Sequence, residues 1–331
     1  MNPLDHPAHD HLPHDFAPHD FASQDFSFHA PPKSRSSAPS LTHLHLGASL
    51  YVPCDHPHLL EIARGDKLPG VRSLIFCLED SVSEGQLERA LRQLESVLKQ
   101  LEPRPGCLRF VRVRNPEVLR WVLGMDGVDL LDGFVLPKIS TLTLGSYLLS
   151  LPEHSGFWLM PTLETRDVFE EGRMLELRAA LEGVKHQVIS LRIGGNDLLG
   201  LLNLRRLRGK TLYQTPLSSV VARLVSIFKP HGYNLSAPVY DIAHDSETLT
   251  TETRLDLEHG LFGKTAIHPS QIAPIEAEYR VDPLELRVAE ATLKDDVPAV
   301  FMLEDHMCEV ATHRNWALEV VSRAEIYGVR G

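Results

Sequence analysis

The fold is decided by three apolar runs that each end at acidic residues and lead into a helical pattern. They are Ser73–Asp80 (SLIFCLED), Phe157–Glu164 (FWLMPTLE) and Val188–Asp197 (VISLRIGGND). Strands of a parallel sheet are covered on both faces, so they read as continuous apolar runs. The carboxyl ends of such strands are where an α/β barrel assembles its active site. Three acidic strand ends in equivalent positions therefore predict one shared metal-binding site.

Strand and helix patterns alternate eight times from Leu44 onward. We expect strands at residues 45–52, 73–79, 108–114, 133–137, 157–162, 188–194, 235–239 and 264–267. We expect helices at residues 56–65, 84–101, 116–124, 141–150, 167–182, 216–229, 246–260 and 269–279. Eight alternations predict an α/β fold of the (β/α)8 TIM-barrel type, which needs about 250 residues. An open doubly wound sheet is disfavoured, because no Gly-x-Gly-x-x-Gly turn follows the first strand.

The chain divides into three predicted segments. Residues 1–42 form a tail rich in His, Asp, Phe and Pro, and residues 43–295 form the barrel. Residues 296–331 form a C-terminal helical extension or lid, with a helix expected near 306–327.

The tail repeats a short polar unit, because Pro13–Ala17 and Pro18–Ala22 both read PHDFA. No core can be built from such a sequence, so we expect it to be disordered. It lacks the basic region, apolar run and cleavage site of a secretory signal. Its histidines could bind a transition metal weakly, but a solvated tail explains them without one.

The composition predicts a globular cytoplasmic protein. Hydrophobic residues make up 43% of the 331 residues, which is enough for a core. The formal charge of −11 argues against a general nucleic-acid surface, and no apolar stretch is long enough to cross a membrane. The four cysteines are widely separated and form no Cys-x-x-Cys pair. We therefore expect free thiols in a reducing cytosol rather than disulfides or a zinc site.

Glu164 and Asp197 are the predicted metal ligands. Both lie just beyond an apolar strand, and no cysteine or histidine is close in sequence. Two carboxylates suit a hard cation such as Mg²⁺, which prefers oxygen ligands. Helix capping is the alternative role for either acid alone. The adjacent Gly194 and Gly195 would let backbone N–H groups approach an anionic ligand closely.

A second group of charged residues is predicted to bind substrate. Arg112 and Arg114 are two residues apart and so share one face of a strand. A guanidinium inside a barrel needs carboxylate partners, either from an acidic substrate or from the metal site. Lys138 also follows a strand. Glu79 and Asp80 could contact metal-bound waters or orient the arginines, or begin the next helix. An outward arginine paired with a surface acid is the alternative for either arginine.

Two further patterns are set aside. Gly263-Lys264-Thr265 resembles the end of a phosphate-binding P-loop, but Glu258 stands where the first glycine is required. His306, Cys308 and His313 do not have zinc-finger spacing, so we expect packing or surface roles for them.

A series of motifs in the chain resembles the HpcH/HpaI aldolase and citrate lyase β-subunit-like superfamily. The resemblance covers roughly residues 44–295 and is closest to the bacterial C–C bond lyase branch of the TIM-barrel fold, often associated with tellurite-resistance and stress gene clusters. The motifs are LYVP (50–53), LEDSV (78–82), VRVRNP (111–116), VLPK (135–138), LET (163–165), GGNDL (194–198) and GKTAIHPSQ (263–271).

The resemblance implies a Mg²⁺-dependent barrel that breaks or forms a carbon–carbon bond in a small oxo or β-hydroxy acid or its CoA thioester. Glu164 and Asp197 would bind the metal and Arg112 would bind substrate, with Arg114 as an inserted residue. Members are commonly trimers or hexamers, sometimes with a C-terminal segment over a neighbour's site. No general base is evident, and Asp305 in the extension is our candidate, with a metal-bound hydroxide as the alternative.

The chain departs from the family pattern at two cysteines. Cys77 stands where the family usually has an acid, and Cys54 stands where a glycine is expected. These changes put the usual CoA-thioester substrate in doubt and leave the metal pair intact. Two alternatives to a lyase therefore stay open: a thioester hydrolase of the malyl-CoA type, and a non-catalytic barrel in a stress-response complex.

Overall fold

The computed structural model describes residues 41–153 and 155–331. The predicted disordered tail falls outside the described residues, apart from Leu41 and Thr42. No helix within the described part of the chain is long and apolar enough to span a membrane. All four cysteines are buried free thiols.

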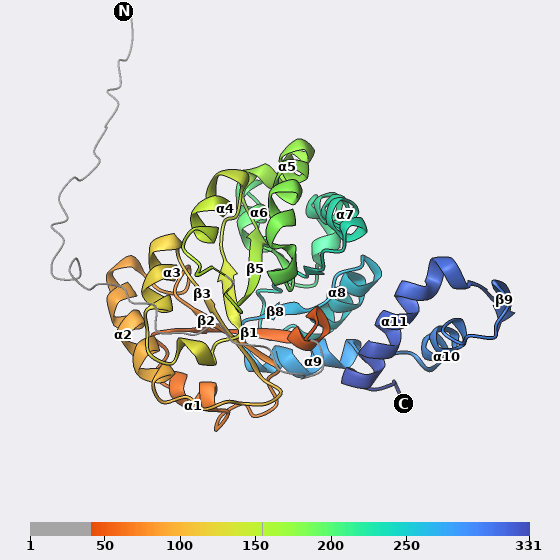
Figure 1. The fold of residues 1–331 in the computed structure, drawn as a ribbon, viewed down its shortest axis with the longest axis horizontal. Coiled ribbons are helices and arrows are strands. Elements are labelled where there is room, and N and C mark those ends of the chain that lie inside the picture. The colour runs from red at the N-terminus through yellow and green to blue at the C-terminus, as the bar shows by residue number, and fades with distance from the viewer. Residues whose placement is uncertain (1–40, 154) are drawn as a thin grey trace, which may run out of the picture.

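Eight parallel strands form the barrel, surrounded by helices (Figure 1). The spatial order is β7-β6-β5-β4-β3-β2-β1-β8, and a bridge between Ala237 and Lys264 joins the two ends of this order. The predicted TIM-barrel fold is therefore confirmed. The strands are β1 (Ala48–Pro53), β2 (Ser73–Cys77), β3 (Leu108–Arg112), β4 (Gly133–Leu136), β5 (Trp158–Leu163), β6 (Leu191–Ile193), β7 (Leu235–Ser236) and β8 (Lys264–Ala266).

The helices lie outside the strands. They are α1 (Leu59–Arg64), α2 (Leu87–Leu98), α3 (Pro116–Leu123), α4 (Thr141–Leu148), α5 (Glu171–Leu181), α6 (Gly195–Leu201), α7 (Leu217–Phe228), α8 (Ser246–Glu258) and α9 (Ile272–Glu278). Each predicted helix of the barrel is present with shifted ends. The prediction missed α6, which is only seven residues long and contains two glycines, so it shows no readable period.

Local signals explain where several helices begin. At α3, the Asn115 side chain accepts a hydrogen bond from the Val118 backbone N–H at 2.9 Å, and Pro116 occupies the first turn. Both are standard start signals, because a cap satisfies a free N–H and proline has none to satisfy. In α2, Ala90, Leu94 and Val97 are buried on one face. These helices therefore pack against the sheet through one apolar stripe.

Two separate apolar groups make up the barrel core. The larger lies between strands and helices, and the smaller fills the barrel interior. The interior group comprises Leu46, Ile75, Phe110, Val135, Met160 and Ile189. Four of them lie on β2, β3, β4 and β5, while Leu46 precedes β1 and Ile189 precedes β6. One set of alternate strand residues therefore points inward, as the two-residue period of a strand requires. Nearer the carboxyl ends of the strands, the inward residues are polar, as at Thr162 and Arg192.

The C-terminal segment forms an arm of two helices and a hairpin. Its elements are α10 (Pro283–Thr292), β9 (Val300–Leu303), β10 (His306–Glu309) and α11 (Val310–Tyr327). The expected helix start at residue 306 is wrong, because 306–309 pairs with β9. Glu304 and Asp305 both have positive φ, which is typical of a two-residue hairpin turn.

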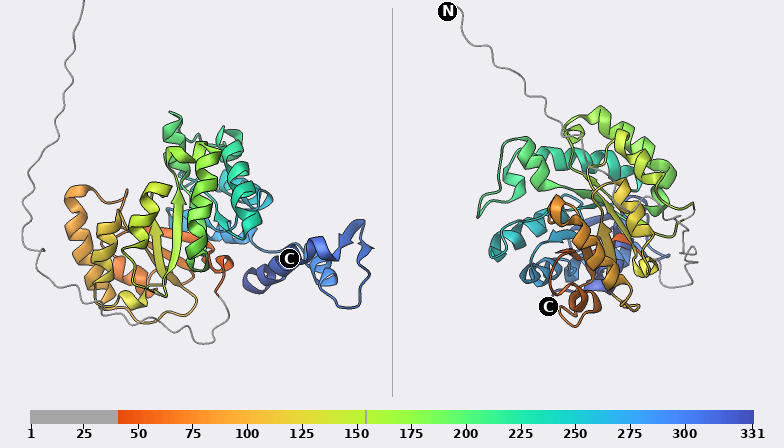
Figure 2. Two further views of the ribbon diagram at one scale, coloured as in Figure 1. Left: turned by 45° about the horizontal axis from the view of Figure 1, so that its top comes forward. Right: turned by 90° about the vertical axis from the view of Figure 1, so that its left-hand side faces the viewer.

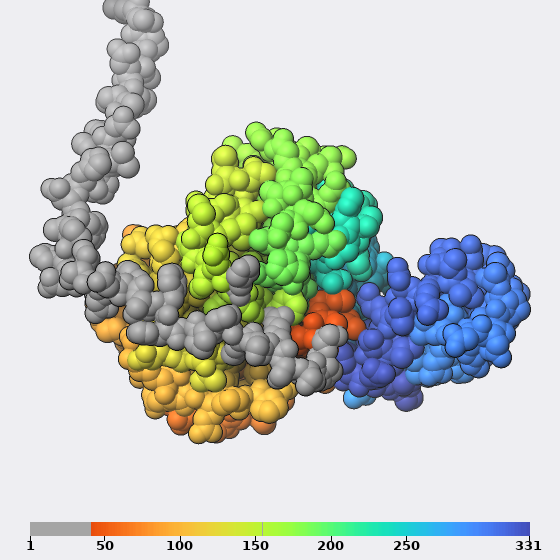
Figure 3. Space-filling view, viewed as in Figure 1, coloured from red at the N-terminus to blue at the C-terminus, as the bar shows by residue number. Residues whose placement is uncertain are grey.

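The arm extends to one side of the barrel in Figure 1, in the left view of Figure 2 and in the space-filling view of Figure 3. Its helices pack through a small apolar group of Val281, Ala289, Ala317 and Val320. Its base is joined to the barrel where the Tyr327 hydroxyl donates to the Leu44 carbonyl at 2.6 Å. The hairpin lies at the end of the arm away from the barrel strands (Figures 1 and 2).

Candidate active site

Six charged side chains meet at the carboxyl ends of β2 to β6, and we call them the mouth cluster. Its members are Glu79, Asp80, Arg112, Lys138, Glu164 and Asp197. They are linked by ion pairs between residues up to 59 positions apart in sequence. The sequence named all six, and parallel strands bring them together because their carboxyl ends share one edge.

Arg112 connects three of the acids. Its Nη2 atom lies 2.8 Å from Glu79 Oε2, 3.2 Å from Asp80 Oδ2 and 3.3 Å from Glu164 Oε1. The guanidinium also lies over the ring of Tyr51, with 5.9 Å to the ring centre. Its side chain is only 11% exposed. Arg112 is thus the arginine of the pair that faces the site.

Arg114 has a different environment. Its guanidinium donates to the backbone carbonyls of Leu78, Glu79 and Val82, and no carboxylate is recorded within 4.0 Å in the described chain. It therefore fixes the loop after β2, and with it the positions of Glu79 and Asp80. Within the described residues, Arg114 makes no recorded contact with the charged side chains of the other site residues, so its role in substrate binding stays a prediction.

Lys138 bridges both halves of the mouth cluster. Its backbone N–H donates to Glu164 Oε1 at 2.9 Å, while its Nζ pairs with Glu79 and lies 3.9 Å from Asp197 Oδ1. The residue has a φ of 50°, a conformation that non-glycine residues seldom adopt. Strain of this kind persists only where surrounding contacts hold it, and it concentrates at functional sites.

Glu164 is the most buried acid of the cluster, with 4% exposure. Burial raises its pKa to about 7, and the negative charge of Asp197 acts in the same direction against the opposing effect of Arg112. A cation next to both carboxylates would remove this cost. Burial also raises the pKa of Glu79.

Gly194 makes room for Glu164. A Cβ atom on Gly194 would lie 2.2 Å from Glu164 Oε2 and 2.4 Å from Glu164 Cβ, distances that real contacts do not reach. A Cβ on Gly195 would meet Pro238 at 2.7 Å. Both glycines are therefore required by close packing. Their proposed role in binding an anionic ligand through N–H groups stays a prediction.

The mouth cluster fits a divalent cation. Four carboxylates face two cations, so the fully ionised cluster has a formal charge of −2. Asp197 lies in the first turn of α6 with its side chain 32% exposed, which leaves it free to bind a ligand. Within the described residues no three His, Cys, Asp or Glu side chains form a ready-made metal cage. Mg²⁺ suits such a site, because it is commonly bound by one or two carboxylates and completes its shell with water and substrate.

Asp305 lies apart from the mouth cluster. It occupies the turn between β9 and β10, at the end of the arm away from the barrel strands (Figures 1 and 2). No contact with the cluster is recorded for it. Within one chain, the structure does not bring the candidate base to the site.

The sequence reasoning missed three residues near the site: Tyr51, Arg192 and Thr265. The Arg192 guanidinium lies over the Tyr51 ring, 5.4 Å from its centre, and donates to the Thr265 hydroxyl. The signal that could have found Arg192 is its charge inside the apolar run 188–194, because a charged side chain in a buried strand needs a reason.

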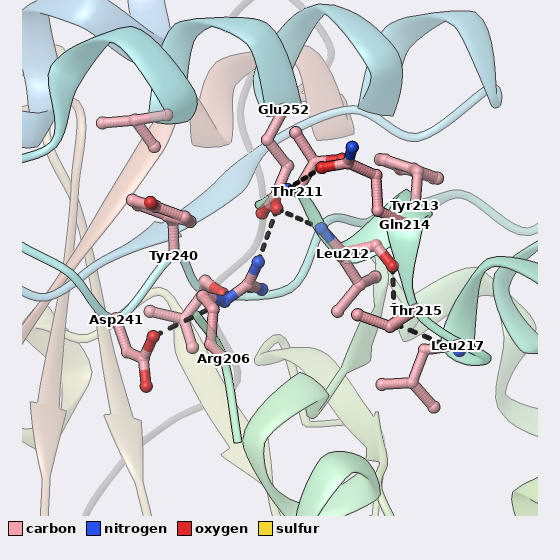
Figure 4. A network of polar contacts seen from close by, with 12 residues as sticks. Arg206, Thr211, Leu212, Tyr213, Gln214, Thr215, Leu217, Tyr240, Asp241 and Glu252 are labelled. Carbon is pink, nitrogen blue, oxygen red and sulfur yellow. Dashed lines mark hydrogen bonds and ion pairs between the residues drawn. The ribbon is translucent and has the colours of Figure 1, made fainter. Parts of the chain in front are cut away.

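A second charged group lies beside β8, and we call it the buried network: Arg206, Glu252, Asp256 and Lys264. Lys264 Nζ lies 2.9 Å from Glu252 Oε1 and 2.8 Å from Asp256 Oδ2. Arg206 reaches the other oxygen of Glu252 at 2.5 Å and approaches Asp241 (Figure 4). Lys264 is fully buried, so the Gly-Lys-Thr sequence supplies a structural ion pair and no phosphate loop.

Comparison with known proteins agrees with this architecture. The profile of the family described as C–C bond lyase of the TIM-barrel fold matches residues 40–329. A (3S)-malyl-CoA thioesterase from Cereibacter sphaeroides is 27% identical over 242 residues, covering 72% of this chain and 79% of the relative.

Solved structures share the fold. CitE from Mycobacterium tuberculosis, in complex with magnesium, acetoacetate and coenzyme A, superposes with a TM-score of 0.65 at 22% identity, over 85% of this chain and 99% of that one. RipC from Yersinia pestis superposes with a TM-score of 0.52 at 23% identity, over 71% and 95%. The chain therefore belongs to the C–C bond lyase family of the TIM-barrel fold.

Proposed function

We propose that the protein is a Mg²⁺-dependent carbon–carbon lyase or aldolase acting on a small β-hydroxy or oxo acid, free or as a CoA thioester. The observation behind this proposal is the mouth cluster, in which Glu164 and Asp197 both contact Lys138 at the mouth of the barrel and the group has an excess of negative charge. A cluster with a formal charge of −2 is what a site for a divalent cation requires.

The residues of the cluster have distinct parts in the proposed reaction. Glu164 and Asp197 would hold Mg²⁺, which when bound stabilises the negative charge that develops on substrate oxygens. Arg112 would bind a carboxylate of the substrate and so align the bond that breaks. Glu79 and Asp80 hold the Arg112 guanidinium in place, and Lys138 positions Glu164 through its backbone N–H.

A general base completes the proposed chemistry. It removes the hydroxyl proton, the electron pair forms a carbonyl, and the carbon–carbon bond breaks to leave an enolate on the other fragment. We assign this base to Asp305 of a second copy of the chain. The arm supports the assignment, because it extends from the barrel and exposes apolar side chains, including Val300, Met302 and Met307. The active form would then be a homo-oligomer.

Ligands of the structural relatives support the substrate class. The CitE structures include complexes with magnesium and oxaloacetate, and with magnesium, acetoacetate and coenzyme A. An oxo acid and its thioester are therefore the first substrates to test with this chain.

A thioester hydrolase is the second candidate, and a specific observation favours it. The curated relative at 27% identity is a (3S)-malyl-CoA thioesterase. The same metal and arginine would serve both reactions, because each develops negative charge on the oxygen of a thioester. Release of free CoA without carbon–carbon cleavage would distinguish the hydrolase from the lyase.

The test is Mg²⁺-linked thermal stability of the full chain, with and without oxaloacetate, pyruvate, glyoxylate or acetyl-CoA. A ligand that binds only the folded state stabilises it by about 2.7 kcal/mol at a concentration a hundred times its Kd. We expect Mg²⁺ to raise the melting temperature and an oxo acid to raise it further. Glu164→Gln and Asp197→Asn should each remove both effects while the fold is kept.

Asp129→Asn is the matched control. Asp129 is an exposed first-turn acid before β4, at the opposite end of the barrel, so its substitution should leave the Mg²⁺ effect unchanged. Unaltered Mg²⁺ binding in Glu164→Gln would refute the metal assignment. No response of the parent chain to any metal would instead favour a non-catalytic barrel.

A further inference from the structure

A second group of polar side chains lies inside the barrel, two strand residues before the mouth cluster. Arg192 on β6 is directly paired with Thr162 on β5 and with Ser236 on β7. The Arg192 guanidinium itself contacts Thr265 on β8 and the ring of Tyr51 on β1. We call these five residues the inner level. Their side chains point into the barrel, because Arg192 also touches Met160 of the interior apolar group at 3.6 Å.

Arg192 is a buried cation without a counter-charge. Its exposure is 2%, and no carboxylate lies within 4.0 Å of it in the described chain. Its recorded hydrogen bonds reach only the hydroxyl of Thr265 and the sulfur of Met160, which is a weak acceptor. A guanidinium has five N–H donors and is always charged, so most of its bonding capacity is unused here.

The other arginines with little exposure have oxygen acceptors from carboxylates or backbone carbonyls. Arg112 pairs with three carboxylates, and Arg206 pairs with Glu252 and Asp241. Arg109 donates to the backbone carbonyls of Glu102 and Ala63. Buried charges normally have such partners, and among these four Arg192 alone has neither a carboxylate nor a backbone carbonyl as a hydrogen-bond partner in the described chain.

Two hydroxyls next to Arg192 are also without partners. Thr162 Oγ1 and Ser236 Oγ are both buried and make no hydrogen bond in the structure. Buried polar groups nearly always find a partner, and an unsatisfied one calls for an explanation such as a bound molecule. The direct cross-strand neighbours of an uncompensated cation therefore provide two more groups that a ligand oxygen would satisfy.

Two residues of the inner level are partly exposed. They are Tyr51 and Thr265, and both contact the buried guanidinium. Thr162 precedes Glu164 by two residues, and Arg192 precedes Gly194 by two. Two residues of strand span about 6.6 Å, so one small molecule with acidic groups at both ends reaches from the mouth cluster to the inner level.

We propose that the inner level is an anion subsite that binds a second carboxylate of the substrate, with Arg192 as its main ligand. The inference rests on the proposed function and narrows it to small dicarboxylic oxo or hydroxy acids. Arg112 is already neutralised by three acids of the mouth cluster, whereas Arg192 has its full charge available. Thr265, Thr162 and Ser236 add hydrogen bonds to the same carboxylate.

The experiment compares oxaloacetate with pyruvate, which lacks one of its carboxylates, by calorimetric titration of the full chain in Mg²⁺. We expect the parent protein to bind oxaloacetate more tightly. Arg192→Gln should weaken oxaloacetate binding about 10- to 100-fold, the loss expected for hydrogen bonds to a charged group. Pyruvate and Mg²⁺ binding should stay close to the parent values.

Two further variants keep the test decisive. Arg109→Gln removes an equally buried arginine from β3, which is not adjacent to β6, and should leave the preference for oxaloacetate intact. Thr162→Val removes an unpartnered hydroxyl with little change of shape, so it should fold even where Arg192→Gln does not. It should weaken oxaloacetate about 2- to 10-fold and leave pyruvate unchanged.

The outcomes separate this inference from the proposed function. An unchanged preference in Arg192→Gln, or in Thr162→Val where the first variant is unfolded, overturns the subsite while Mg²⁺-dependent binding still supports the lyase. If the parent binds neither oxo acid in Mg²⁺, the proposed function fails, and malonate in Mg²⁺-free buffer decides the subsite. If the parent binds malonate and Arg192→Gln does not, the anion subsite is supported. If the parent does not bind malonate, the subsite is refuted together with the proposed function.

Discussion

The mouth cluster and the buried network are both groups of oppositely charged side chains, but they differ in solvent exposure and in charge balance. In the buried network, Glu252 and Lys264 have no exposure at all, and each acid is matched by a cation at hydrogen-bond distance. In the mouth cluster, acids outnumber cations by two, and Asp80, Lys138 and Asp197 are open to solvent. The charges of the buried network are balanced without a ligand, whereas those of the mouth cluster are not.

This difference separates a structural role from a functional one. Removing charges from water is costly, so a sealed group survives only when its members satisfy each other. The buried network does so, and it ties the segment containing Arg206 and Leu212 to α8 and β8 (Figure 4). The open mouth cluster, with its surplus negative charge and strained Lys138 backbone, instead has the features that the proposed cation and substrate site requires.

The largest effect should come from breaking the closed group. Lys264→Met leaves Glu252 and Asp256 without their shared cation in a buried site, so we expect a loss of about 3 to 5 kcal/mol in the free energy of unfolding. Denaturant unfolding monitored by circular dichroism measures it. Glu164→Gln in the mouth cluster should cost far less, because it removes an acid that burial disfavours when charged. Equal losses in the two variants would contradict the distinction between the groups.

An intermediate effect is expected from pH in Mg²⁺-free protein. The pKa of Glu164 rises from 4.5 to about 7 on folding, so between these values the folded state holds a proton that the unfolded state has released. Stability from this group is therefore full below pH 4.5 and falls as pH rises to about 7, by about 3 kcal/mol. Unfolding measured across this range should show the decline.

Two comparisons check the assignment of that decline. Glu164→Gln should flatten this part of the profile, and saturating Mg²⁺ should flatten it in the parent, because a bound cation favours the carboxylate. A decline that is identical in Glu164→Gln would mean that another group titrates.

The smallest effect should come from filling the space beside Glu164. Gly194→Ala places a methyl group against the Glu164 side chain, and we expect a loss of about 1 to 3 kcal/mol together with weaker Mg²⁺ binding. Gly200→Ala, inside α6 with nothing within 4 Å of the new carbon, should stabilise the protein by about 0.5 to 1 kcal/mol and leave Mg²⁺ binding unchanged. Thermal unfolding with and without Mg²⁺ tests both. Tight Mg²⁺ binding in Gly194→Ala would show that Glu164 is not held in place by this contact.

Local pattern was sufficient for the barrel itself. Each strand appears as a short apolar run and each main helix as a longer amphipathic segment, because burial imposes those periods on the chain. The pattern failed at α6, whose glycines obscure any period, and in the arm, where the hairpin 300–309 was read partly as helix. At the hairpin, pairing between β9 and β10 outweighed the helical preference of the sequence from residue 306. Such pairing depends on the partner strand, which a short stretch of sequence does not show.

The sequence by itself determined the fold class and the residues of the mouth cluster, because acids at the carboxyl ends of parallel strands must converge. Only the tertiary structure decided which member of the Arg112 and Arg114 pair enters the site. The sequence places both on one face of the predicted strand, but β3 ends at Arg112 and the loop after β2 accepts the hydrogen bonds of Arg114. The tertiary structure also decided that Lys264 is sealed in an ion network and that Arg192 is not. Whether a buried charged side chain has an ion-pair partner depends on residues far apart in the chain, which only the packing of the fold brings together.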